Sequence, residues 1–363
     1  MPFWGIRNNR LPEHIQIALG ILFIRNNTDG GEKMRENKHT GRGELPYVPE
    51  GALRGRSECA AYMVNRRTLE DAMREGVTLE AMCTMCDGET MQLSVELPDG
   101  IHGIIPREEA CYAMFGEEIK DIAIITRVGK PVQFKIMDIR SGDGGQTIAY
   151  LSRRAAQEEC AAFYVSRLER GDIIPARITH LEPFGAFCDI GCGLVSLLTV
   201  DKISVSRISH PADRFRVGEF TSVVVHSIAD DGRIYLTHRE LLGTWEENAA
   251  EFAPGQTVTG IIRSIEDYGV FVELAPNLAG LAELCDGVNP GETCSVYIKS
   301  IIPERMKVKL VLIDTCGPAA LTPCRYFIDT ERVDHISRWV YSPEGSSKTV
   351  MTDFTEAVAA VKR

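Results

Sequence analysis

Residues 171–190 read GDIIPARITHLEPFGAFCDI, and residues 255–274 read GQTVTGIIRSIEDYGVFVEL. The two stretches align without a gap. In each, a Gly opens an alternating strand, an aromatic residue precedes a second Gly, and another aromatic residue begins the next strand. Because internal self-similarity is the mark of a repeated unit, we expect two copies of one β-rich domain.

Both copies continue in the same order. A Gly-Leu pair, a Gly-Glu turn and a closing basic-apolar alternation follow at 193–194, 218–219 and 233–236 in one copy, and at 280–281, 291–292 and 307–310 in the other. Five strands in about 60 to 70 residues match the size of an OB barrel. A more distant third copy, which lacks the aromatic-Gly-x-aromatic segment, is formed by residues 91–97, 103–107, 128–136 and 147–152.

The predicted fold class is therefore mainly β, with three tandem five-stranded OB barrels. Ala, Leu and Glu at helical spacing in residues 152–169 and 238–252 predict short helices between the barrels. The predicted parts are a poorly ordered N-terminal segment (1–44), a helical lead-in (45–75), a degenerate barrel (76–153), two regular barrels (171–240 and 254–314) and a C-terminal β-hairpin appendage (315–363). We expect the strands of this hairpin at 335–341 and 348–354, where residues alternate on either side of a turn. Met34 reads as naturally as a start as Met1 does, so we expect residues 1–33 to be upstream sequence.

Composition limits the classes of protein. The chain has 363 residues and a net charge of −11, and its longest apolar run, Ile15 to Ile24, is too short to cross a bilayer. Arg25 and two Asn follow that run in place of a cleavage site, so we expect no secretory signal. Eleven scattered Cys residues favour a reducing cytoplasm.

No known catalytic or metal-binding motif is present in the sequence. It has no Walker loop, no GxSxG and no HExxH, and the single CxxC at Cys83 and Cys86 has no second pair at finger-like spacing. We therefore expect a protein that is not an enzyme and that uses no cofactor or metal.

Exposed aromatic rings are the candidates for binding, because OB barrels hold single strands by stacking bases on such rings. Gly185 and Gly269 permit a bend or bulge that brings two rings to one surface. We expect the first ring of each pair to be exposed. The candidates are Phe184 and Phe187 in one barrel, and Tyr268 and Phe271 in the next.

Polar residues on neighbouring strands are further candidates for contact with phosphate or sugar, although each one alone is more typical of a solvated strand face. Residues 171–243 hold seven bases against nine acids, so a single barrel should bind weakly and linked barrels should compensate. The polar candidates are Arg177, His180, Arg233, Arg263, Lys299 and Lys307.

Residues 76–314 resemble tandem S1 domains, the OB-fold RNA-binding modules of the bacterial small-subunit ribosomal protein S1 family. The resemblance rests on Phe184-Gly-Ala-Phe187 and Tyr268-Gly-Val-Phe271, on Leu151-Ser-Arg-Arg154 as a domain-closing motif, and on Thr244-Trp-Glu-Glu-Asn248 as an inter-domain helix. It implies a monomeric cytoplasmic protein that binds single-stranded RNA, especially mRNA, at the small ribosomal subunit or another ribonucleoprotein.

The chain departs from the family at one position. Where the family often carries a His after Gly-Leu-Val, this chain has Ser196, Glu283 and, in the first unit, Pro106. The resemblance also implies that the first barrel contacts protein rather than RNA. Two other hypotheses stay open: a scaffold that docks on the ribosome or an RNA-processing complex without gripping RNA, and an accessory chain of an RNA-degrading enzyme.

Overall fold

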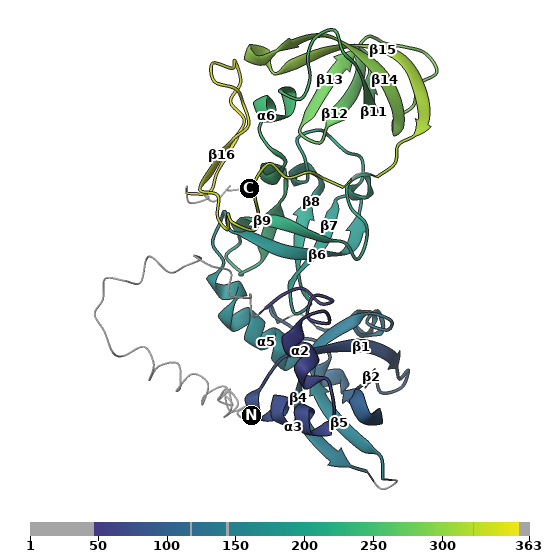
Figure 1. The fold of residues 1–363 in the computed structure, drawn as a ribbon, viewed down its shortest axis with the longest axis vertical. Coiled ribbons are helices and arrows are strands. Elements are labelled where there is room, and N and C mark those ends of the chain that lie inside the picture. The colour runs from purple at the N-terminus through teal and green to yellow at the C-terminus, as the bar shows by residue number, and fades with distance from the viewer. Residues whose placement is uncertain (1–46, 117, 143–144, 322, 356–363) are drawn as a thin grey trace, which may run out of the picture. The chain divides into compact units, whose positions relative to one another are not determined.

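The computed structural model describes residues 47–116, 118–142, 145–321 and 323–355, all within the compact unit Leu45–Arg363. The expectations for residues 1–44 lie outside these residues. Along the described chain, three closed five-stranded barrels follow one another and a two-stranded hairpin comes last (Figure 1). The predicted fold class is confirmed.

Two helices precede the first barrel. The second, α3, begins at a capping box in which Asn65 and Thr68 exchange hydrogen bonds, and it ends at Gly76 in the left-handed conformation. Its Leu69 and Ala72 are buried in the core of the first barrel. The helices are α2 (Ser57–Tyr62) and α3 (Arg66–Glu75).

The first barrel closes in the strand order β1-β2-β3-β5-β4 around a core that includes Leu79, Leu93 and Phe134. Each of its five strands contributes buried residues to the interior, which side chains fill as in other small barrels. The elements are β1 (Leu79–Cys86), β2 (Leu93–Glu96), η1 (Pro98–Gly100), β3 (His102–Ile105), η2 (Arg107–Glu109), α4 (Asp121–Ile125), β4 (Pro131–Ser141) and β5 (Thr147–Ser152).

The second barrel repeats this order as β10-β8-β7-β6-β9, with the last strand parallel to the third. Ile178, Leu198 and Leu236 are among its fully buried side chains. The elements are β6 (Ile173–Glu182), β7 (Gly185–Gly191), β8 (Leu194–Thr199), η4 (Val200–Lys202), η5 (Pro211–Asp213), β9 (Phe220–Ile228) and β10 (Ile234–Thr237).

The third barrel has the same order, β11-β12-β13-β15-β14, and the same parallel pairing of its third and fifth strands. The elements are β11 (Thr257–Glu266), β12 (Gly269–Ala275), β13 (Leu278–Ala282), β14 (Glu292–Ile302), η7 (Pro303–Arg305) and β15 (Lys307–Pro318). The sequence repeat thus corresponds to a repeat of topology.

Short helices connect the barrels, as the sequence predicts. The Ser152 hydroxyl caps α5, and a capping box between Thr244 and Glu247 opens α6. The elements are α5 (Arg153–Phe163), η3 (Val165–Arg167), η6 (Arg239–Leu242) and α6 (Trp245–Ala249).

The C-terminal hairpin consists of β16 (Arg338–Val340) and β17 (Met351–Asp353). Its strands are shorter than the predicted 335–341 and 348–354, because the residues before β16 pair with the second barrel instead. Asp172 forms a β-bridge with His335, and the Ile336 N–H donates to the Gly171 carbonyl at 2.8 Å. On the third barrel, the Tyr341 hydroxyl donates to the Asn277 carbonyl at 2.7 Å.

No helix among the described residues is long and apolar enough to cross a membrane.

Candidate nucleic-acid interface

The two predicted aromatic pairs adopt the same geometry in the second and third barrels. The ring centroids of Phe184 and Phe187 lie 6.0 Å apart at an interplanar angle of 89°, and those of Tyr268 and Phe271 have the same separation and angle. Phe184 is 55% exposed and Tyr268 is 68% exposed, so the expected exposure of the first ring is confirmed. The second ring of each pair is half-buried.

The Gly between the rings acts through close packing. A Cβ atom on Gly185 would lie 2.5 Å from the Leu198 carbonyl oxygen, and one on Gly269 would lie 2.5 Å from the Ala282 carbonyl oxygen. Of the bend or bulge expected at these glycines, the bulge is not found there. The register irregularity lies on the neighbouring strand, between Ile178 and His180 in the second barrel, with its counterpart in β11 of the third. The Gly lets the next strand approach closely enough to support the pair.

In the second barrel, Phe187 belongs to a row of paired residues that crosses four strands. His180 pairs with Phe187, Phe187 with Leu197, and Leu197 with Tyr235. The His180 and Phe187 rings are stacked with centroids 6.2 Å apart, and His180 Nε2 lies 2.7 Å from Glu182 Oε1. This row therefore places the rings of Phe187 and His180 beside the Glu182 carboxylate.

The third barrel carries the corresponding row from Ser264 to Phe271, Leu281 and Lys309. The Lys309 side chain is exposed, as is that of the predicted residue Lys307 two positions before it on β15. A cation thus occupies the place that Tyr235 holds in the second barrel.

Tyr235 and Lys309 are absent from the sequence-based candidates. Both are third in the closing alternation, where Arg233 aligns with Lys307 and Tyr235 with Lys309. Period-two alternation in that aligned segment was enough to identify them, because outward-facing residues recur at every second position.

The first barrel has no aromatic pair in this place. Its corresponding row runs from Ser94 to Ile104 and Tyr150, and Ser94 is buried. The prediction of a degenerate first unit agrees with this geometry.

The remaining basic candidates differ in their surroundings. The Arg233 side chain is 51% exposed, and its guanidinium lies 5.3 Å from the centroid of the Phe115 ring and 3.5 Å from Asp231. Lys299 is exposed on β14. Arg233, Lys299 and Lys307 therefore remain accessible to a phosphate backbone.

Arg177 and Arg263 have partners within the protein. Arg177 donates to the Glu50 carbonyl at 3.1 Å and to the Gly218 carbonyl at 3.2 Å. The Arg263 side chain is 8% exposed, and its guanidinium donates to both carboxylate oxygens of Glu273, at 2.7 and 3.1 Å. Contact of either residue with RNA stays a prediction, but these bonds give both side chains a structural role.

An acid two residues after the second ring ties each barrel to neighbouring segments. In the third barrel it is Glu273, which also accepts from Arg214 of the second barrel at 2.5 Å. In the second barrel it is Asp189, which accepts from the backbone N–H groups of Glu50, Gly191 and Gly193 at 2.7, 2.9 and 3.0 Å. The acid at the penultimate position of the repeated motif, Asp189 or Glu273, is thus a junction residue.

Burial affects the pKa values of the two carboxyls at the junction formed by Asp189 and Glu50. Burial and the nearby Glu50 carboxylate raise the pKa of Asp189 to about 7. Burial also opposes ionisation of Glu50, but the guanidiniums of Arg153 and Arg127 outweigh it and lower the pKa of that carboxyl. The ion pair between Arg153 Nε and Glu50 Oε1 is 2.7 Å long, and both side chains are almost fully buried.

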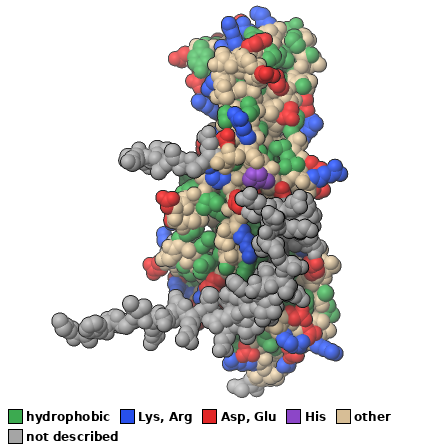
Figure 2. All heavy atoms as spheres, turned by 90° about the vertical axis from the view of Figure 1, so that its left-hand side faces the viewer, with side chains coloured by type: hydrophobic (Ala, Val, Ile, Leu, Met, Phe, Trp, Pro, Cys, Tyr) green, Lys and Arg blue, Asp and Glu red, His purple; other side chains and the backbone are tan. Residues whose placement is uncertain are grey.

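Charges outside these junctions are mixed in sign. On the face shown in Figure 2, basic and acidic side chains are interspersed over the described surface. With a net charge of −11, the chain offers little of the clustered positive charge that drives counterion release. Among the described residues, no group of three or more His, Cys, Asp or Glu side chains is placed to hold a metal ion.

This architecture defines a tandem OB-fold protein, and a family comparison identifies the type of barrel. Residues 167–239, which contain the second barrel, match the family model of the S1 RNA binding domain. The S1-type resemblance is confirmed for the second barrel.

Ribosomal proteins are similar to parts of the chain longer than one barrel. The chain is 34% identical to small ribosomal subunit protein bS1 of Leuconostoc lactis over 190 residues, which cover 49% of this chain and 44% of that protein. It is 25% identical to bS1 of Staphylococcus saprophyticus over 290 residues (73% and 70%), and 27% identical to bS1 of Rhizobium meliloti over 240 residues (60% and 40%). The chain thus spans 40% of the length of the Rhizobium meliloti protein.

Among solved structures, a multidomain protein with nucleic acid binding domains from Streptococcus pneumoniae is 13% identical, with a TM-score of 0.22, over 66% of this chain and 73% of that one.

Proposed function

We propose that the chain binds single-stranded RNA, including mRNA, by stacking bases on the aromatic pairs of its second and third barrels. One observation carries this proposal: two aromatic pairs, each with an exposed first ring, repeat the same centroid distance and interplanar angle, and one of them lies in the segment that matches the S1 RNA binding domain. Exposed aromatic rings are the surfaces on which OB barrels stack the bases of a single strand.

The physical chemistry favours stacking over electrostatic attraction. Each stacked base contributes about 1 to 3 kcal/mol, and every base has a face that can stack. Because the chain is acidic, one barrel alone should bind weakly. A strand that reaches both barrels gains from the high effective concentration of the second site.

The same proposal includes a place of action. Similarity to proteins named small ribosomal subunit protein bS1 supports association with the small ribosomal subunit. We infer that the chain acts there as a monomer in the cytoplasm, by binding rather than by catalysis. Sedimentation with small subunits at low salt and release at high salt would support this part. Co-sedimentation that survives nuclease treatment, with no RNA affinity, would favour the protein scaffold instead.

Titration of labelled single-stranded RNA tests the binding itself. The double variant Phe184→Ala/Tyr268→Ala should lose at least about 30-fold in affinity, because two stacking platforms are removed. Phe220→Ala is a matched control, because Phe220 is 51% exposed but lies on β9, outside both rows. Unchanged affinity in the double variant would reject the aromatic platform.

A further inference from the structure

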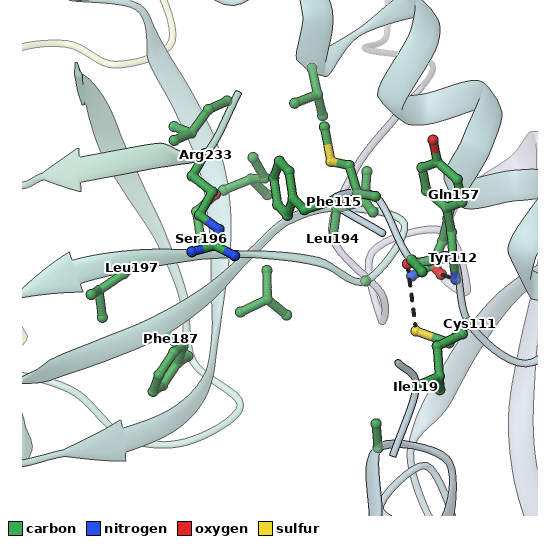
Figure 3. Close-up of a pocket in the computed structure, with 18 of the residues that line it drawn as sticks. Cys111, Tyr112, Phe115, Ile119, Gln157, Phe187, Leu194, Ser196, Leu197 and Arg233 are labelled. Atoms are coloured by element: carbon green, nitrogen blue, oxygen red, sulfur yellow. Dashed lines mark hydrogen bonds between the residues drawn. The ribbon is translucent and has the colours of Figure 1, made fainter. Parts of the chain in front are cut away.

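A segment of the first barrel lies against the RNA face proposed for the second. The connection between β3 and β4 contributes Tyr112, Phe115 and Ile119 to a pocket of about 600 Å³, and the opposite wall comes from strands of the second barrel. In Figure 3, Phe187 and Leu197 lie on the side of those strands, and Cys111, Tyr112 and Ile119 lie on the side of the segment. The volume is within the range of small-molecule sites.

We propose that this pocket accepts one base of the RNA strand held by the second barrel. The inference rests on the proposed function and names a subsite within it. Its first support is continuity: Phe187, Leu197 and Tyr235 belong both to the cross-strand row and to the wall of the pocket. A strand that stacks on the row therefore passes the mouth of the pocket.

The lining suits a nucleotide, which combines a base that has apolar faces with a charged phosphate. The walls are mostly aromatic and aliphatic, and the charged residues that line the pocket are two cations, Lys120 and Arg233, and one acid, Glu118. That balance is positive in a chain whose net charge is −11. Apolar walls beside two cations thus favour a nucleotide, with its flat base and its phosphate, over a basic or purely apolar peptide.

Phe115 is the key residue of the segment. The Arg233 guanidinium lies 5.3 Å from its ring centroid, a cation–π contact that joins the segment to the second barrel (Figure 3). A half-exposed guanidinium beside a ring can contact a phosphate while the ring contacts the base. The first barrel then contributes to RNA binding through this segment, although its own row carries Ser94 in place of an aromatic residue.

An abasic scan on the full chain tests the proposal. A labelled single-stranded oligonucleotide is titrated with each nucleotide in turn replaced by an abasic one, against wild type, Phe115→Ala and Phe115→Tyr. Phe220→Ala serves as control, because Phe220 also contacts a guanidinium, that of Arg177 at 5.6 Å, but lies outside the pocket. Thermal melting verifies that each variant is folded.

The proposal predicts that Phe115→Ala weakens binding about 5- to 150-fold, that Phe115→Tyr restores it, and that one abasic position costs wild type affinity but costs Phe115→Ala nothing. If Phe115→Ala binds RNA as wild type does while Phe184→Ala/Tyr268→Ala does not, the subsite is refuted and the proposed function stands. If wild type binds no RNA, both fail.

Discussion

Replacing Glu273 by Gln should destabilise the third barrel, because Glu273 is the shared counter-charge of two buried guanidiniums. Its Oε2 lies 2.5 Å from Arg214 Nη2 and 2.7 Å from Arg263 Nε, and the three side chains are only 4 to 8% exposed. Removing one partner of a buried ion pair costs about 3 to 5 kcal/mol, since the remaining charge is left uncompensated. Asp213, which is 29% exposed and 3.6 Å from Arg263, makes a longer and more solvated contact and compensates only part of this charge.

Urea unfolding followed by Trp fluorescence measures this cost, because Trp245 and Trp339 are buried in the same core cluster as the third barrel. With a slope of about 2 kcal/mol per M, the unfolding midpoint of Glu273→Gln should fall by about 2 M. Glu283→Gln makes the same change of charge at an exposed position of this barrel and should stay within about 0.5 kcal/mol. Equal midpoints for the two variants would refute the junction role and return Arg263 to the RNA candidates.

Two further predictions concern pH and packing. Burial lowers the pKa of His238 to about 4 in the folded protein. Between about pH 6.5 and pH 4, this imidazole is therefore protonated in the unfolded chain but neutral in the folded one. Stability should therefore fall by about 2 kcal/mol from pH 7 to 5 through this group, and His238→Gln should remove that part of the pH dependence. Gly185→Ala should cost about 1 to 3 kcal/mol, because its Cβ would lie 2.5 Å from the Leu198 carbonyl oxygen; calorimetry that shows no loss would contradict the close-packing role of this Gly.

The barrels and the aromatic pairs could be predicted from sequence because both depend on local patterns that the chain repeats. Period-two alternation sets which residues face a core, and the aligned copies 171–190 and 255–274 reinforce each other. The hairpin was predicted with strands that are too long, because pairing of residues near His335 with Asp172 depends on a contact 163 positions away.

The roles of the basic residues could not be predicted in the same way. Strand alternation predicts that the Arg263 side chain points away from the core of its own barrel. It does not predict that Glu273 and Arg214 join Arg263 in one cluster at a junction between barrels. The segment that carries Phe115 has no helical or strand period, so nothing local predicts that it packs against the next barrel. Long-range pairing of charges and loops is decided by the assembled fold.

Dependence of affinity on RNA length tests most directly whether two barrels hold one strand. An oligonucleotide of about 6 nucleotides covers one barrel, whereas one of about 30 can reach both. We expect the long RNA to bind wild type at least about 100-fold more tightly than the short one, and Phe184→Ala or Tyr268→Ala alone to remove most of this gain. A gain that persists in both single variants would contradict it.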